Sequence, residues 1–459
     1  MTIRRVVIVG AGVSGLAVAF RLQARRPDAD IVVLERAERP GGTTWSEREN
    51  GFLFEHGPNG FLDTAPATLD LARDLGLDDQ LVTASPTAGT NRYLFLDGRL
   101  KLLPNGFGSF VTTDLLGWRA KISLLWERFR GGRREDGDES IDAFARRRAG
   151  DEAADVFADA LVTGIFAGDP KLLSLPACFP RIAQMEREHG SVMKGFFAQA
   201  RERRAAGRPA SSMRSFTGGM RVLIDGLVKR LGKPPIFGVA VRAIQRDVNR
   251  AAWSVHGDRE TWEADAVVLT CPAYQQAAIL GDIDKEIAEM VAGIPYNRVA
   301  VVAMGYRAAD VPSMDGFGFI APQNTRRDLL GVQWCSSIYP QRAPDGSVLM
   351  RAMCGGWQRA DVVDWHDARL LEAMRHELKL AMNVTAAPIY HKIIRWDKAI
   401  PQYHLGHLDR VARIDARLTQ HPGLFLGGNA YRGVALNDCT EQGAILAERV
   451  ASFLAPERK

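Results

Sequence analysis

The sequence has few cysteines, and their spacing provides neither a metal site nor a redox pair. No two of them form a CxxC pair, and no group of them has the spacing of zinc ligands. Such usage is typical of proteins from reducing compartments, so no metal is expected. The five residues are Cys178, Cys271, Cys335, Cys354 and Cys439.

Long apolar runs and targeting segments are also lacking. No run of about 18 apolar residues occurs, which excludes a membrane-spanning helix. The first expected strand begins at Arg4, which leaves no room for a signal or transit peptide. We therefore expect a cytoplasmic protein.

No nucleic-acid motif accompanies the formal net charge of +5 and the sequence isoelectric point near 9.0. This mild basic excess suits an anionic substrate or an anionic membrane surface, and nucleic acid is not an expected partner. The 459 residues are 46% hydrophobic and 25% charged. That balance is typical of a globular chain with two or three domains and a large core.

The start of the chain contains a strand, a glycine turn and a helix. Gly10 suits the tight turn, Gly12 lets the backbone approach a pyrophosphate, and Gly15 lets the helix pack closely on the strand. The helix N-terminus then offers unpaired N–H groups and a partial positive charge to the phosphates. The expected pyrophosphate contacts are Gly10, Ala11, Gly12, Val13, Ser14 and Gly15.

A second strand over residues 31–34 ends in Glu35. This acid follows the last glycine of the turn by roughly 20 residues, the spacing at which a carboxylate holds the ribose hydroxyls of an adenosine. A glycine triplet alone is weak support, because such turns also occur as ordinary loops. Strand, helix and acid together favour dinucleotide binding.

The nine residues from Glu35 resemble the second glycine pair of the amine oxidase-like flavoproteins, a family whose first strand, turn and helix carry the same triplet. In that family the arginine and the glycine pair wrap the flavin side of the pyrophosphate. The resemblance therefore implies FAD rather than NAD. The residues that carry it here are Glu35, Arg36, Arg39, Gly41, Gly42 and Thr43.

The same resemblance implies further FAD contacts. The turn at residues 57–60 would lie beside the isoalloxazine ring, and two valines would complete the adenine pocket. Asn429 stands where relatives often have an acid, and the backbone at residues 434–436 would lie against the ring. These contacts are Gly57, Pro58, Asn59, Gly60, Val239, Val241, Trp396, Gly428, Asn429, Val434, Ala435 and Leu436.

The order of patterns predicts an α/β fold with a Rossmann-type FAD-binding domain split in sequence, an α+β substrate domain and a helical, membrane-facing insert. A β-hairpin is expected at residues 91–104, where Asp97 and Gly98 form a two-residue turn. We expect the FAD-binding domain at residues 1–63, 206–275 and 405–459, the substrate domain at 64–90 and 276–404, and the helical domain at 91–205. Helices are expected at residues 140–166 and 180–204 of the helical domain and at residues 367–382 of the substrate domain.

Residues 114–130 have a helical period, and two readings of them stay open. Their apolar positions fall on one stripe that contains Trp118 and Trp126, flanked by basic residues such as Arg119 and Arg128. Tryptophans beside cations suit a helix at a membrane interface. A helix that turns its apolar side to the core and its basic side to solvent fits equally well.

Four stretches make the chain similar to the protoporphyrinogen oxidases over nearly its whole length. They lie at residues 91–98, 164–170, 396–407 and 427–439. The resemblance implies six-electron oxidation of protoporphyrinogen IX to protoporphyrin IX, with dioxygen reoxidising the flavin and releasing hydrogen peroxide at each of three turns. It also implies a homodimer and a surface that contacts the membrane.

A porphyrinogen is a large apolar macrocycle with propionate groups, so its site should be an apolar slot with cations at the rim. By resemblance Arg92 binds a propionate, and the backbone at Ala167 and Gly168 approaches the macrocycle, where a carbonyl could orient pyrrole N–H groups. The expected apolar wall contains Leu330, Val332 and Leu349. No catalytic acid or base is assigned, because the cofactor carries the chemistry.

Three other functions stay open. A coproporphyrinogen III oxidase would use the same flavin chemistry on a substrate with more propionates. Another flavin oxidase of the same superfamily would act on amines or polyenes. A non-catalytic FAD-binding protein of the haem pathway would hold FAD and produce no peroxide.

Overall fold

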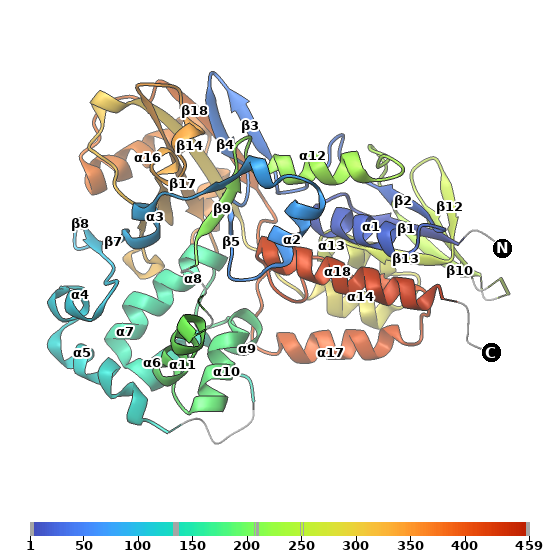
Figure 1. The fold of residues 1–459 in the computed structure, drawn as a ribbon, viewed down its shortest axis with the longest axis horizontal. Helices are drawn as coiled ribbons and strands as arrows, with labels where there is room; N and C mark the ends of the chain where they lie inside the picture. The colour runs from blue at the N-terminus through green and yellow to red at the C-terminus, as the bar shows by residue number, and fades with distance from the viewer. Residues whose placement is uncertain are drawn as a thin grey trace.

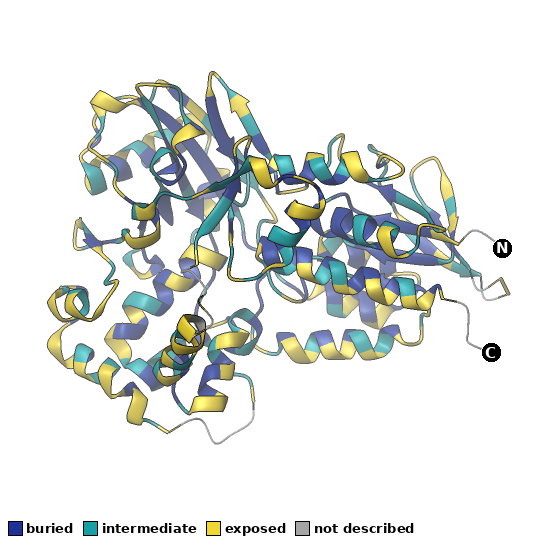
Figure 2. Ribbon diagram, in the orientation of Figure 1, coloured by how far each residue is buried: buried dark blue, intermediate teal, exposed yellow. Residues whose placement is uncertain are grey.

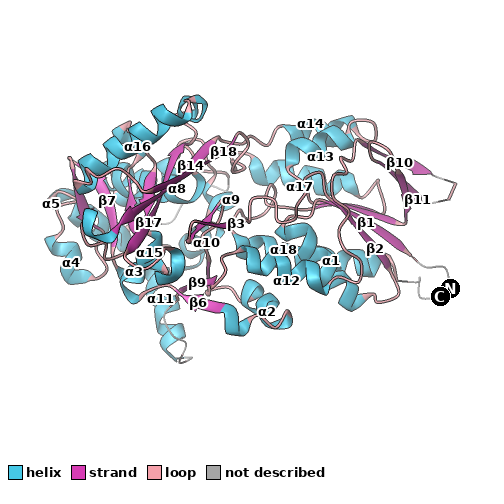
Figure 3. Cartoon of the chain, turned by 90° about the horizontal axis from the view of Figure 1, so that it is seen from above, coloured by secondary structure: helices cyan, strands magenta, loops and turns pink. Residues whose placement is uncertain are grey.

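The computed structural model describes residues 4–131, 137–205, 207, 211–247, 249, 250 and 252–455. Two halves lie side by side along the longest axis (Figure 1). One half carries both chain ends and a parallel sheet, and the other combines a larger sheet with a layer of helices. Seen from above, the two sheets occupy opposite ends of the molecule (Figure 3).

The first half is built on a four-stranded parallel sheet whose strands come from distant parts of the chain. The strand order is β19 (Leu424–Leu426), β13 (Ala266–Leu269), β1 (Arg5–Val9) and β2 (Asp30–Leu34). Val6 pairs with Ile31 on one side and with Ala266 on the other. The sheet therefore combines strands from three segments that lie far apart in the chain.

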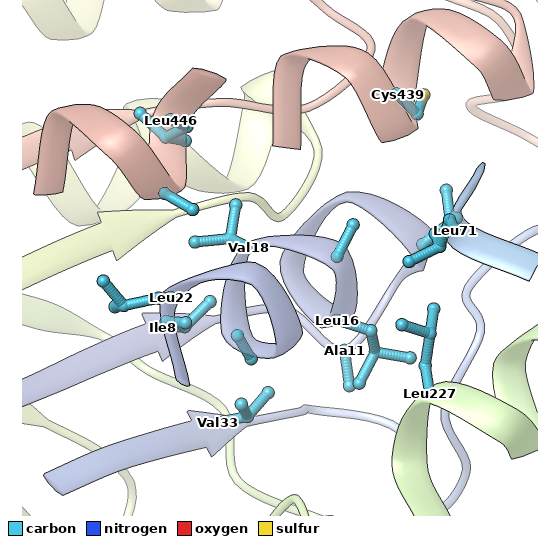
Figure 4. Close-up of a cluster of buried hydrophobic side chains, with 14 of the residues drawn as sticks. Ile8, Ala11, Leu16, Val18, Leu22, Val33, Leu71, Leu227, Cys439 and Leu446 are labelled. Carbon is cyan, nitrogen blue, oxygen red and sulfur yellow. The ribbon is translucent and has the colours of Figure 1, made fainter. Parts of the chain in front are cut away.

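Helices cover one face of this sheet: α1 (Val13–Arg25), α2 (Ala67–Asp74), α12 (Arg221–Arg230) and α18 (Leu436–Phe453). Figure 4 shows Leu16, Val18 and Leu22 of α1 among the side chains that fill the space between these layers. Helices α1 and α18 approach so closely that a Cβ added at Gly443 would lie 2.9 Å from the Cβ of Ala17. Small residues thus set the distance between the two helices.

The other face carries the antiparallel strands β10 (Ala243–Asp247), β11 (Ala252–His256) and β12 (Thr261–Ala264), with helices α13 (Ala273–Leu280), α14 (Lys285–Ala292) and α17 (His407–Leu418). Ile279 of α13 and Val291 of α14 belong to the same buried cluster as Val7 of β1. Both helices therefore pack with the nucleotide half, which the predicted boundary at residue 275 would have excluded.

The second half is built on a seven-stranded mixed sheet. Its strand order is β18 (Tyr390–Trp396), β14 (Val299–Arg307), β17 (Ser347–Gly355), β16 (Gly331–Gln333), β15 (Gly318–Ile320), β7 (Arg92–Leu96) and β8 (Arg99–Leu102). Helix α16 (Asp367–Met382) covers one face. The predicted hairpin forms and pairs with β15, so it belongs to this sheet and not to the helical part that the boundary at residue 91 assigned it to.

The helical part contains two breaks inside predicted helices. Gly150 has a φ of 95° and separates α6 from α7 within the predicted helix at residues 140–166. Gly190 has a φ of 67° and, with Ser191, separates α10 from α11 within residues 180–204. The buried Glu127 accepts a hydrogen bond from the Ser191 hydroxyl and pairs with Arg148, which fixes both breaks.

The helices here are α4 (Phe107–Thr112), α5 (Trp118–Leu125), the 3₁₀ turn η2 (Trp126–Phe129), α6 (Ile141–Ala149), α7 (Asp151–Ala153), the π turn η3 (Ala154–Ala158), α8 (Asp159–Phe166), α9 (Leu175–Cys178), α10 (Pro180–His189) and α11 (Val192–Ala205).

Shorter elements join the halves: β3 (Ser46–Glu49) with β4 (Phe52–Glu55), a sheet of β5 (Phe61–Leu62), β9 (Met213–Phe216) and β6 (Leu81–Thr83), and the helices α3 (Pro86–Thr90) and α15 (Cys335–Ile338). The 3₁₀ turns are η1 (Asp78–Gln80), η4 (Ala308–Asp310), η5 (Gln323–Thr325), η6 (Pro340–Arg342) and η7 (Ala360–Asp364).

The apolar stripe of α5 and η2 faces outward. Trp118 is 67% exposed and Trp126 is 60% exposed, whereas Leu115 just before the helix is buried. Figure 2 shows exposed residues along α4 and α5, in contrast to the buried strands of the large sheet. The core-facing reading of this stripe is therefore wrong. Within the described residues, no helix has the length and hydropathy needed to cross a bilayer.

Candidate functional site

The glycine turn after β1 has the geometry that a pyrophosphate needs. Gly10 has a φ of 106°, and a Cβ there would lie 2.9 Å from the Cys271 nitrogen. A Cβ at Gly15 would overlap the Gly10 carbonyl, so the helix packs directly on the turn. At Gly12, in contrast, an added Cβ would meet no atom of any described residue within 4 Å. The backbone at Gly12 is thus open to a ligand, and the first turn of α1 has no side-chain cap.

The second glycine pair lies opposite this turn. Gly41 forms a bridge with Gly12, and its N–H donates to the Ala11 carbonyl at 2.8 Å. Arg39 folds over the pair: its guanidinium donates to the carbonyls of Pro40 and Gly42 and lies 4.4 Å from the Trp45 ring centre. Burial lowers the pKa of Arg39. A half-buried cation beside the second glycine pair, which faces Gly12, fits a phosphate.

Glu35 follows β2 and is oriented by the same turn. Its carboxylate accepts from the N–H groups of Ala11 and Ala37 at 2.7 and 2.8 Å. Its own backbone carbonyl accepts from the N–H of Val239, and Val239 and Val241 pack partly buried beside β2. The Arg36 guanidinium lies against the Gln275 amide. These residues form the side of the cradle that suits an adenosine.

The opposite end of the cradle leads toward the large sheet. A Cβ at Gly57 would overlap the Thr43 carbonyl, so the loop after β4 touches the second glycine pair. The Trp396 indole donates to the His56 carbonyl at 3.0 Å. Asn59 is buried, and its amide nitrogen has no partner among the described residues. An orphaned buried donor of this kind is rare and points to a ligand acceptor.

The C-terminal strand and helix complete this end. Gly428 has a φ of 103° and packs on the Thr270 carbonyl, and the Asn429 carbonyl accepts from the Tyr403 hydroxyl. Helix α18 starts at Leu436, after the partly buried Val434 and the N-cap Ala435, whose N–H donates to Asp438. The start of this 18-residue helix adds a partial positive charge.

The residues present fit FAD along this path. Glu35, the open backbone at Gly12 and the orphaned Asn59 amide lie in the order adenosine, pyrophosphate and ring that an extended dinucleotide requires. When bound, FAD supplies a hydride acceptor to whatever lies at the ring end. His56 near that end has a lowered pKa because of burial, and its Nε2 lies 3.1 Å from Glu47.

The predicted apolar wall is only partly assembled. Leu330 packs with Ala167, Val299 and Met353. Val332 instead lies in the cluster covered by α16, on the other face of the sheet, and Leu349 is covered by Phe52 and Phe54. Of the three predicted wall residues, the structure brings only Leu330 to the segment that ends α8.

That segment is held by three buried amides that the sequence analysis missed. Asn297 donates to the carbonyls of Phe166 and Ala167, Gln402 donates to that of Phe166, and Gln323 donates to that of Gly168. Ala167, with a φ of 45°, also accepts from the N–H of Trp357 at 2.8 Å, so its carbonyl already has two donors.

Gly168 is required for packing. A Cβ there would overlap the Gln402 Oε1 atom and approach Leu173. We call Asn297, Gln323 and Gln402 the amide clamp. The packing of these side chains alone requires a glycine at position 168, without reference to a ligand. Gln402 lies in one of the four stretches that carry the resemblance, and this could have drawn attention to it.

Arg92 is the first residue of β7, which lies between β15 and the edge strand β8, and it is on the face of the large sheet turned toward α8. Leu94, two residues further along β7, packs against Ala160 of that helix, and alternation puts Arg92 on the same side. The guanidinium lies 5.0 Å from the Phe317 ring centre, and burial by its neighbours lowers the pKa of Arg92, although its side chain keeps an exposed part. Within the described part of the chain, Arg92 has no ion-pair partner.

A buried charge cluster near the flavin loop was also missed. Glu55, Arg342 and Arg351 lie together beneath residues 56–60. A signal was available for Arg351, since it is a lone charge within the otherwise apolar strand β17. Glu55 and His56 do point to different surroundings, as strand alternation predicts.

Comparison with known proteins agrees with this site. Protoporphyrinogen oxidase from rice chloroplasts (Oryza sativa subsp. japonica) is 31% identical, over 98% of this chain and 88% of its own length. Coproporphyrinogen III oxidase of Bacillus subtilis is 27% identical, over 98% of both chains. A crystal structure from Exiguobacterium sp. 255-15, named as a candidate protoporphyrinogen oxidase, is 26% identical, covers 98% of this chain and 99% of that one, and has a TM-score of 0.85.

The pattern that defines the flavin containing amine oxidoreductases matches residues 13–451, from the first turn of α1 to the last turn of α18. It thus spans the cradle, the large sheet and the helical part together. FAD is the cofactor, as the glycine turns predicted. The chain belongs to the family of the flavin containing amine oxidoreductases.

Proposed function

We propose that this protein oxidises protoporphyrinogen IX to protoporphyrin IX with FAD as hydride acceptor. The alignment carries this proposal: nearly the whole chain is similar to proteins named for the oxidation of porphyrinogens. The two named substrates share one macrocycle and one chemistry. The coarser function, a flavin oxidoreductase of the tetrapyrrole-oxidising type, does not depend on which of them is preferred.

The chain's own residues bind and orient the macrocycle. Arg92 has no ion-pair partner among the described residues and lies on the face turned toward α8, where its guanidinium can bind a propionate bidentately. Leu330 and Met353 give apolar surface beside Ala167, which excludes water from the reacting carbon. No side chain is assigned as a base, because placing the carbon against the flavin supplies most of the effect.

The balance of the reaction requires six electrons in three two-electron steps. Each step transfers a hydride from the macrocycle to the cofactor and releases protons to solvent. We propose dioxygen as the oxidant that restores the flavin, with one hydrogen peroxide released per step.

Coproporphyrinogen III is the second candidate, and the Bacillus subtilis relative favours it. It carries four carboxylates, whereas protoporphyrinogen IX carries two. Among the predicted substrate contacts, Arg92 is the single arginine, which favours the substrate with fewer carboxylates. An amine or polyene oxidase is the third candidate.

The test supplies both porphyrinogens to the purified yellow protein and follows porphyrin fluorescence and peroxide. We expect faster turnover of protoporphyrinogen IX, with three peroxides per porphyrin. Faster turnover of coproporphyrinogen III would replace the substrate and keep the chemistry. Turnover of neither, with FAD bound, would remove the proposal and leave a non-catalytic FAD-binding protein.

We further propose a cytoplasmic protein that associates with an anionic membrane surface and forms a homodimer. The outward-facing Trp118 and Trp126, with the basic Arg119 and Arg128 stacked on neighbouring aromatic rings, support the membrane contact. Phe196 and Phe197 of α11, a helix that contacts η2, are also exposed. Light scattering of the purified protein tests the dimer.

A further inference from the structure

Three buried charges lie together below the loop that follows β4. Glu55 ends β4, Arg342 ends η6 and Arg351 lies in β17, and all three are less than a tenth exposed. The Glu55 carboxylate accepts from the Ser46 hydroxyl at 2.5 Å and the Met220 N–H at 3.0 Å. Its Oε1 atom lies 3.1 Å from Nη1 of Arg342. One carboxylate faces two guanidinium groups, so the cluster has an excess of one positive charge.

Within the described residues, hydrogen bonds satisfy these two guanidinium groups only in part, and Nη2 of Arg342 donates to the Ser215 hydroxyl at 2.8 Å. Nη2 of Arg351 donates to the Gly57 carbonyl at 2.7 Å, but its Nε and Nη1 have no acceptor. Nη1 of Arg342 forms an ion pair with Glu55, but its geometry is not that of a hydrogen bond. Nε of Arg342 also has no acceptor among the described residues. The nearby Arg214 does not add to the excess, since it pairs with Asp63.

Other buried groups near Arg351 also lack a partner among the described residues, and they include one acceptor, Oε1 of Gln333, the residue paired with Arg351 in the sheet. The Tyr339 hydroxyl and the Asn59 amide nitrogen are buried without partners, and the Arg342 guanidinium lies 5.2 Å from the Tyr339 ring centre. Burial lowers the pKa of Arg351 and raises that of Glu55. A buried cation with unsatisfied donors is costly, and such groups cluster at functional sites.

The cluster lies at the flavin end of the cradle. The path from Glu35 through Gly12 and Gly42 continues at Thr43, whose carbonyl touches Gly57. Gly57 is the residue that Arg351 holds. The face of the large sheet that carries Arg351 also carries Arg92, since the register runs from Arg351 to Gln333, Gly318 and Arg92. Arg351 therefore lies between the cradle and the predicted substrate side.

We propose that Arg351 is a positioning residue that stabilises the negative charge of the reduced flavin and holds the loop at Gly57 against the ring. Two-electron reduction of a flavin with uptake of one proton leaves one negative charge on the ring. A fixed positive charge nearby, in surroundings that exclude water, favours this form without reorganisation. Arg351 thus raises the reduction potential of the bound FAD, and Glu55 limits the rise.

The experiment measures the midpoint potential of the bound FAD in the holoenzyme by reductive titration with a reference dye. We expect Arg351→Met to weaken the preference for the reduced flavin about tenfold, which is about 30 mV lower for a two-electron couple. Arg351→Lys keeps the charge and should stay close to the parent. Glu55→Gln removes the opposing charge and should raise the potential, a reversal of sign that a purely structural role would not produce.

Potentials that stay unchanged in both Arg351→Met and Glu55→Gln, or that move in the same direction, overturn the proposal. If Arg351→Met fails to retain FAD, the direction of the Glu55→Gln shift decides alone. The inference requires the FAD site but not the proposed substrate. The titration needs no porphyrinogen, so its failure and a failure of the proposed function are distinguishable.

Discussion

The Arg92 guanidinium makes no ion pair with any described residue and lies on the face of the sheet turned toward α8, which makes it the clearest residue to test. Arg92→Ala should raise KM for the porphyrinogen roughly 10- to 100-fold, because a charged hydrogen bond is worth about 1.5–3 kcal/mol. Turnover should fall much less, since the lost contact is remote from the reacting carbon. Steady-state kinetics on the preferred porphyrinogen measures both.

Arg99 offers a matched control on the same hairpin, because it already pairs with Asp114. Arg99→Ala should leave KM within about twofold, as is usual for an exposed ion pair. Arg92→Lys should recover part of the affinity, since it keeps the charge and loses the planar fork. A fall confined to turnover in Arg92→Ala would place this residue elsewhere in the reaction.

His407 predicts a pH dependence of stability. Burial lowers its pKa from 6.5 to about 4, and its ring stacks on Tyr403 at 4.0 Å while Nε2 donates to the Tyr431 carbonyl. Between pH 6.5 and pH 4, His407 is protonated in the unfolded chain but stays neutral in the native protein. Stability from this group is therefore complete above pH 6.5 and falls by roughly 3 kcal/mol as the pH drops to 4.

Urea unfolding of His407→Gln at pH 7 and pH 5 checks this effect. The variant should be less stable at pH 7, yet lose less stability than the parent on acidification. His56 and His404, whose pKa burial also lowers, add to the same window and remain in the variant. His391→Gln, at an exposed position of β18, should keep the parental slope. Equal slopes in His407→Gln and the parent would contradict the assignment.

Among the elements, α8 depends on side chains from outside the helical part. The amide clamp binds the carbonyls at its end, and Gln402 supplies the donor that reaches Phe166 while it also bonds Ile400. Gln402→Leu should lower the free energy of unfolding by about 1–3 kcal/mol, because buried carbonyls lose their donor. Chemical denaturation measures it, and the exposed Gln420→Leu serves as control. An unchanged value would mean that the carbonyls find other donors.

The outward-facing helix α5 and the turn η2 predict binding to anionic vesicles. The double variant Trp118→Ser and Trp126→Ser should lose most flotation with anionic liposomes at low salt, because it removes the apolar anchors and leaves the cations. Leu380→Ser with Ile389→Ser, at exposed apolar positions in α16 and just before β18, should float like the parent. Absence of binding by the parent itself would remove the membrane proposal.

At the scale of the whole molecule, FAD should tie the two halves together. The cradle uses α1, the loop after β4, the end of β18 and the start of α18, so cofactor binding stabilises only the folded arrangement. Raising free FAD to 100 times its Kd should add about 2.7 kcal/mol to the stability of the apoprotein. Thermal unfolding of apoprotein and reconstituted protein measures this, and an equal Tm would contradict the cradle.

Much of the fold was accessible from local patterns, and the misses have specific causes. The hairpin at Asp97 and Gly98 and the helix at residues 367–382 form as predicted, because turn chemistry and helical period act within a few residues. The breaks at Gly150 and Gly190 were missed because helical period persists across them. The boundaries at residues 91 and 275 were misplaced because sheet membership and helix packing depend on partners far along the chain.

The site divides in the same way. The glycine turns and Glu35 were found because a dinucleotide demands them at fixed spacing. Val332 was assigned to the wall although it lies on the α16 face, since the strand register was unknown. Asn297, Gln323 and Gln402 were missed because nothing local marks an amide that reaches a distant carbonyl.

The sequence by itself determined the cofactor, the strand-turn-helix that opens the chain and the resemblance that led to the family, because each depends on residues close together. Only the tertiary structure decided which face of α5 meets solvent, which residues close the end of α8, and that Arg351 lies between Glu55 and the flavin loop with two of its donors unsatisfied among the described residues. These outcomes depend on burial and charge where segments hundreds of residues apart in the sequence come into contact. Local sequence patterns do not show which of these segments meet.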